Sequence, residues 1–66
     1  MMQLIINGDI CETNALNLAD LLLERGYGEP CYATAVNGDL VQAIDRSSRL
    51  LAEQDKIEIL MPMQGG

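Results

Sequence analysis

QLIINGDICET, at residues 3–13, contains two strand-like segments on either side of Asn7-Gly8. Asn-Gly readily takes the positive φ angles of a two-residue type I′ turn, so this run predicts a β-hairpin. Period-two alternation puts Leu4 and Ile6 on one face of the first strand and Ile5 on the other. We therefore expect Leu4 and Ile6 in a core and Ile5 at an exposed position.

A helix is predicted over residues 18–25, directly after the hairpin. Asn17 is a favourable N-cap, and Asp20 at the third helical position suits the helix dipole. Gly26 can take the left-handed conformation that ends a helix. Leucines at positions 18, 21 and 22 form one apolar stripe, which is typical of a helix packed on a sheet.

Asn37-Gly38 repeats the hairpin signal between strands predicted at residues 31–36 and 39–42. Residues 43–54 contain the Ser47-Ser48 interruption, so we expect a loop with one short helical turn there. With a final strand over residues 56–61, the elements predict an α+β domain whose helix covers one face of the sheet.

The final strand leads into a short tail that ends in Gly65-Gly66. Alternation places Ile57 and Ile59 on one face of this strand and Leu60 on the other. Pro62 lacks an N–H donor and helps to end the sheet ladder. We expect residues 62–66 to form a flexible arm that reaches roughly 17 Å at full extension.

The composition limits what this domain does by itself. Its 66 residues allow one domain, and they include no His, Trp or Phe. Cys11 and Cys31 suit small buried side chains, with a disulfide or redox pair as the alternative, and no metal site is expected. A net charge of −6 disfavours nucleic acid and anionic membranes as partners. Neither a signal peptide nor a membrane-spanning run is visible, which favours the cytoplasm.

The tail suits carboxylate chemistry. A chain-terminal carboxylate is an anion at neutral pH and has to be activated before a nucleophile can attack it. Glycines have no Cβ, so Gly65 and Gly66 could thread a narrow channel and approach a nucleotide closely. Adenylation by an enzyme that holds ATP would convert this carboxylate into a mixed anhydride, which a thiol, persulfide or amine could attack.

The order of elements, NGDLV at residues 37–41, LADLL at residues 18–22 and the Gly65-Gly66 end together resemble the ubiquitin-like sulfur carriers. Within that family, the chain is similar to the thiamine-biosynthesis sulfur carriers, the ThiS family. The resemblance covers essentially the whole chain. It implies a single ubiquitin-like β-grasp domain over residues 1–66, with a mixed sheet of about five strands, one main helix and a flexible tail.

The resemblance also implies a role for Gly66. In the family, a ThiF-type, E1-like adenylating enzyme uses ATP to activate the terminal carboxylate, and sulfur from a cysteine desulfurase route converts it to a thiocarboxylate. A ThiG-type thiazole synthase then takes the sulfur into the thiazole ring of thiamine. The chain would thus be a protein co-substrate that binds no cofactor, and not an enzyme.

Candidate docking residues lie near the root of the tail. Ile5, Leu60 and Met63 would present apolar surface beside Gly65 and Gly66, as interaction patches commonly do. Two other functions stay open at this point. One is the sulfur-donating small subunit of molybdopterin synthase, and the other is a ubiquitin-like binding or protein-modifying module.

Overall fold

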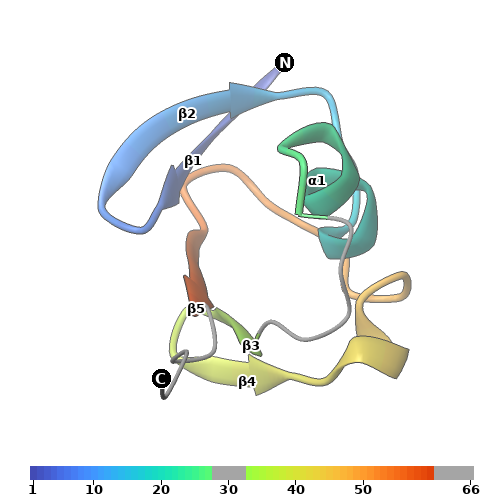
Figure 1. The fold of residues 1–66 in the computed structure, drawn as a ribbon. Helices are drawn as coiled ribbons and strands as arrows, with labels where there is room; N and C mark the ends of the chain where they lie inside the picture. The colour runs from blue at the N-terminus through green and yellow to red at the C-terminus, as the bar shows by residue number, and fades with distance from the viewer. Residues whose placement is uncertain (28–32, 61–66) are drawn as a thin grey trace.

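The computed structural model of the protein describes residues 1–27 and 33–60. Within them lies a five-stranded sheet of order β2-β1-β5-β3-β4, with one α-helix beside it (Figure 1). The elements are, in chain order, β1 (Met2–Ile6), β2 (Asp9–Thr13), α1 (Leu18–Glu24), β3 (Ala33–Val36), β4 (Asp39–Val41), the 3-10 turn η1 (Ala43–Asp45) and β5 (Lys56–Leu60).

The sheet is mixed, and β5 is its central strand. β5 runs parallel to β1 and antiparallel to β3, while the β1–β2 and β3–β4 pairs are antiparallel. The sheet is curved, and α1 lies on its concave side (Figure 1). This arrangement is the ubiquitin-like β-grasp fold, so the predicted α+β class, mixed sheet and covering helix are confirmed.

Both predicted hairpin turns are present. Asn7 and Gly8 have φ angles of 49° and 88°, and Asn37 and Gly38 have φ angles of 52° and 87°. Positive φ at both central residues is the signature of a type I′ turn, whose twist matches that of the flanking strands. The two Asn-Gly pairs therefore fix the β1–β2 and β3–β4 hairpins locally.

Helix α1 begins where the sequence predicts and ends one residue earlier, at Glu24. The Asn17 side chain accepts a hydrogen bond of 2.8 Å from the Asp20 backbone N–H, which satisfies one of the free donors of the first turn. After the C-cap Arg25, Gly26 takes a φ of 85° and ends the helix. Its leucine stripe faces the sheet and is buried at positions 18, 21 and 22.

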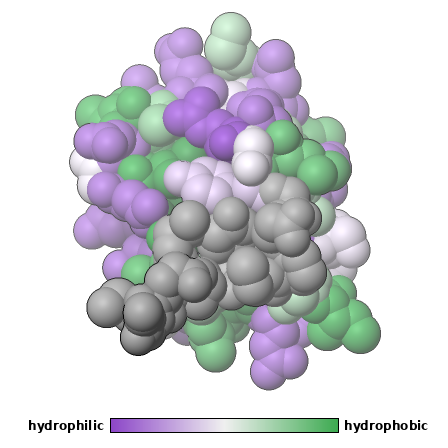
Figure 2. Space-filling view, in the orientation of Figure 1, coloured by the Kyte–Doolittle hydropathy of each residue, from purple (hydrophilic) through white to green (hydrophobic). Residues whose placement is uncertain are grey.

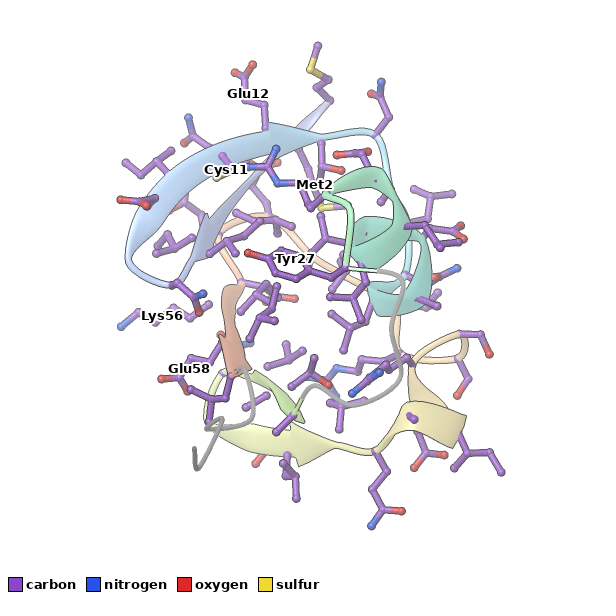
Figure 3. All side chains as sticks on the ribbon, viewed as in Figure 1. Met2, Cys11, Glu12, Tyr27, Lys56 and Glu58 are labelled. Carbon is purple, nitrogen blue, oxygen red and sulfur yellow. The ribbon has the colours of Figure 1, made fainter. Side chains whose placement is uncertain are left out.

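The core lies between α1 and the concave side of the sheet. The buried apolar side chains come from every strand of the sheet except β2, from α1 and from the loops on either side; they are Leu4, Ile6, Ala15, Leu18, Leu21, Leu22, Val36, Val41, Leu51, Ile57 and Ile59. Met2, Cys11 and Tyr27 pack against its edge, and Tyr27 reaches from the end of α1 toward the sheet (Figure 3). Cys11 is a free thiol that packs as a small apolar side chain. Cys31 lies outside the described residues.

Segment ends differ slightly from the prediction. β4 ends at Val41 and not at position 42, because Gln42 is already the residue that caps η1. The predicted short helical turn within residues 43–54 is confirmed as η1. The predicted extensions of β3 to residues 31–32 and of β5 to residue 61 fall outside the described residues, as does the predicted tail at residues 62–66.

A buried polar contact ties η1 to the sheet. The Thr34 hydroxyl donates to the Val41 carbonyl at 2.8 Å and accepts from the Arg46 Nε at 3.1 Å. Thr34 and Arg46 are both buried, so each bond satisfies a polar group that water does not reach. The contact holds the segment after β4 against β3.

Replacing Leu21 by alanine tests the helix–sheet core. Leu21 is fully buried, so Leu21→Ala should lower the free energy of unfolding by about 2–5 kcal/mol. A domain of this size rarely has more than about 3–5 kcal/mol of stability, and the variant should therefore be largely unfolded at 25 °C. Leu23→Ala, in the same helix but 69% exposed, should change stability by only about 0.5 kcal/mol. Urea unfolding followed by circular dichroism measures both, and equal losses would contradict this core.

Candidate functional site

The convex face of the sheet, which we call the outer face, points away from α1 and carries exposed apolar side chains. Ile10 on β2, Leu40 on β4 and Leu60 on β5 are 70%, 71% and 62% exposed. Ile5 on β1 is half-buried. The alternation that buries Leu4, Ile6, Ile57 and Ile59 thus leaves their neighbours at this surface.

Strand register brings these residues into neighbouring positions. Ile5 lies opposite Ile10 in the β1–β2 pair and opposite Lys56 in the β1–β5 pair. On the other side of β5, Ala35 lies between Glu58 and Leu40. The outer face therefore has apolar flanks around a charged centre on β5.

The charged centre consists of Lys56 and Glu58, which project from β5 away from α1 (Figure 3). They lie two positions apart on the same face of the strand, with opposite charges. A partner that covers this surface would have to meet both charges as well as the apolar flanks. A small apolar ligand does not suit this surface, because it would cover both charges without pairing them.

A shallow groove runs along β5 between the two hairpin turns. It is lined by Ile5, Asn7, Gly8, Gly38, Lys56, Ile57, Glu58 and Leu60. Two of the residues that the sequence singles out for docking, Ile5 and Leu60, thus line one groove. Met63, the third, lies outside the described residues.

Exposed apolar residues also occur elsewhere, including Met1, Leu16, Leu23, Ile44 and Leu50. In the view of Figure 2, hydrophobic residues lie scattered among hydrophilic ones. Exposure alone therefore does not mark a site. The outer face is distinguished by the position of Leu60, which is the last residue of the last described strand.

The side-chain amides of the two turn asparagines hold β5 at opposite ends. Asn7 bonds to Ile59 through both amide atoms, at 2.9 Å and 3.2 Å. The Asn37 Oδ1 accepts from the Lys56 N–H at 2.9 Å, and its Nδ2 donates to Asp55 at 2.9 Å. Each asparagine therefore fixes its own turn and a strand that is far away in the sequence.

The predicted reactive residues, Gly65 and Gly66, lie outside the described residues. Leu60, the last residue of β5, precedes them by five and six positions in the sequence. Within residues 1–27 and 33–60, no group of His, Cys, Asp or Glu side chains could hold a metal ion. The same residues include no helical segment with the length and hydropathy of a membrane span.

The sequence reasoning missed Ile10 and Leu40 as outer-face residues, and it gave Asn7 only a role in its turn. Alternation within residues 9–13 and 39–41 separates Ile10 from Cys11 and Leu40 from Val41, so that signal was available. No local signal indicates that Asn7 bonds to Ile59, since the two residues are 52 positions apart.

Comparisons with known proteins agree with this fold. The model of the ThiS family matches residues 4–66. A crystal structure of the thiamine biosynthesis protein ThiS from Geobacter metallireducens aligns with a TM-score of 0.83 and 23% identity, covering 98% of this chain and 100% of that one. At this identity, the likeness shows the fold. No curated protein sequence matches the chain.

Proposed function

Because the chain belongs to the ThiS family, we propose that it is a sulfur carrier of thiamine biosynthesis whose reactive group is the carboxylate of Gly66. The observation that carries this proposal is the family match, which runs through the β-grasp body and includes Gly65 and Gly66. The protein is then a co-substrate of other enzymes and does not itself catalyse the reaction.

The first step activates the Gly66 carboxylate. One of its oxygens attacks the α-phosphorus of ATP held by a ThiF-type activating enzyme. Pyrophosphate leaves, and the carbonyl carbon becomes part of an acyl adenylate. Glycine at both tail positions suits this step. A residue with a Cβ would need a wider channel in the activating enzyme than glycine needs.

The second step exchanges oxygen for sulfur. Hydrosulfide that attacks the acyl carbon displaces AMP and leaves the thiocarboxylate after loss of one proton. A persulfide from a cysteine desulfurase route instead forms an acyl disulfide, and a thiol has to reduce it to free the thiocarboxylate. The thiocarboxylate is nucleophilic but tethered, and a thiazole synthase receives its sulfur.

The outer face is the surface that we propose for docking to these enzymes. The exposed Leu40 and Leu60 and the half-buried Ile5 support this proposal, because apolar side chains gathered on one face commonly mark an interaction surface. An enzyme seated there would meet the chain where β5 ends and the tail begins. Docking would thus bring Gly66 within reach of an active site that lies up to roughly 17 Å away, the full extension of five residues.

The charging reaction tests the proposed function. We expect purified protein, incubated with ATP, a sulfur source and a thiamine-type activating enzyme, to gain the mass of one sulfur atom minus one oxygen atom. A variant that lacks Gly66 should gain nothing and keep its circular dichroism spectrum. Intact-mass spectrometry measures both.

The other candidate functions predict different outcomes of these assays. If a molybdopterin-type activating enzyme forms the thiocarboxylate and the thiamine-type enzyme does not, the chain would be the small subunit of molybdopterin synthase. An isopeptide bond from Gly66 to lysines of other proteins, without sulfur gain, would indicate a protein-modifying module. If a known carrier is charged in parallel and this chain is not, the sulfur-carrier function is wrong.

Truncating Leu60 tests the docking surface. Leu60→Ala should raise the KM of the activating enzyme for this protein by about fivefold or more, since interface hot spots contribute about 1 kcal/mol or more. Leu23→Ala is the matched control, because Leu23 is similarly exposed but lies on α1. Its KM should stay within about twofold of that of the unmodified protein. Equal effects of the two variants on KM, measured by pyrophosphate release, would rule out the outer face as the docking surface.

A further inference from the structure

The Asn7 side chain completes the sheet where β1 stops. β1 ends at Ile6, paired with Ile57 of β5, because the chain turns away at Asn7 and Gly8. The Asn7 backbone N–H still donates to the Ile57 carbonyl at 2.9 Å. Beyond that bond, the backbone of the first hairpin no longer follows β5.

The amide group of Asn7 stands in for the missing backbone. Its Oδ1 accepts from the Ile59 N–H at 2.9 Å, and its Nδ2 donates to the Ile59 carbonyl at 3.2 Å. A carboxamide has the same donor and acceptor as a peptide group, so it extends the parallel ladder by one residue. Ile59 is thereby held on its β1 side by a side chain.

The position of Ile59 matters because it is the last buried residue of the described chain. It is 4% exposed, whereas Leu60, which follows it, is 62% exposed. On the β3 side, the pairing of Ile59 with Thr34 and of Leu60 with Ala33 keeps the strand in the sheet. The Asn7 amide adds the second side, and a strand held from both sides has less freedom to swing or fray.

Asn37 provides an internal comparison. It occupies the same position in the other type I′ turn, with φ of 52° against 49° for Asn7. Its N–H donates to the Lys56 carbonyl at 2.7 Å, and its Oδ1 accepts from the Lys56 N–H at 2.9 Å. Asn37 thus holds the start of β5, and Asn7 holds its end.

We propose that Asn7 is a positioning residue for the reactive tail: its amide fixes Ile59, and so fixes the end of the strand to which the tail is joined. This inference rests on the proposed function, because it concerns how Gly66 reaches the activating enzyme. Reactions between a tethered group and an active site are sensitive to small misplacements of the reacting atoms. Greater mobility at the end of β5 should therefore slow the chemical step. Docking should be less affected, because Ile5, Leu40 and the pairing with β3 are retained.

Asn7→Gly and Asn37→Gly form a matched pair of variants. Glycine favours positive φ, so both turns keep their geometry while each loses only its side-chain amide. In Asn7→Gly, we expect hydrogen exchange of the Ile59 N–H to accelerate at least tenfold. In Asn37→Gly, the accelerated amide should be that of Lys56, and the exchange rate of Ile59 should stay within twofold of the original.

The kinetic readout separates positioning from stability. With the thiamine-type activating enzyme, Asn7→Gly should lower kcat for adenylation at least threefold and change KM less than twofold. Asn37→Gly should leave both within twofold, at a temperature where urea unfolding shows both variants to be fully folded. Asn7 also lines the groove, so a purely docking role would instead raise KM.

The outcomes are distinct. Equal loss of kcat in both variants, or an unchanged kcat in Asn7→Gly despite faster exchange at Ile59, would overturn the positioning role alone. An unchanged exchange rate at Ile59 would show that the Asn7 amide does not hold β5 in solution and would overturn it as well. Failure of the unmodified protein to be adenylated, with a known carrier active in parallel, would overturn the proposed function and with it the kinetic role of Asn7.

Discussion

The placement of β5 between β1 and β3 is the constraint on which the rest of the structure depends. β5 is parallel to β1, and parallel neighbours cannot be joined by a tight turn. The chain between them has to return to the same end of the sheet, and α1 lies within that return. Ile57 and Ile59 then face the leucine stripe of α1. β5 therefore joins the two hairpins into one sheet and also contributes to the core.

In the proposed function, the same strand joins the folded body to the reactive end. Its inner face is buried with the core, while Glu58 and Leu60 remain at the outer face. Under that function, a strand end that is fixed in the sheet would keep Gly66 close to a docked active site, which would raise its effective concentration there. The body would then supply the surface for recognition, and the proposed chemistry would need only a terminal carboxylate.

Much of the fold could be read from the sequence. Asn-Gly at two places predicted both hairpins, Asn17 and Gly26 bracketed the helix, and alternation put Ile5 and Leu60 on the outer face. These signals are local, since they depend on φ preferences, capping and the pleat of a strand. Ile10 and Leu40 were missed although the same alternation was available for them. That they share one surface with Ile5 and Leu60 depends on which strands are neighbours, and alternation does not specify this.

The sequence by itself determined the local elements and the faces of the strands, because the backbone preferences of adjacent residues decide them. Only the tertiary structure decided the strand order β2-β1-β5-β3-β4, the groove that joins Ile5 to Leu60, and the partner of the Asn7 amide. Asn7 illustrates the difference. Its positive φ follows from Asn-Gly, but its bonds to Ile59 span 52 positions and exist only because β1 and β5 are paired in this register.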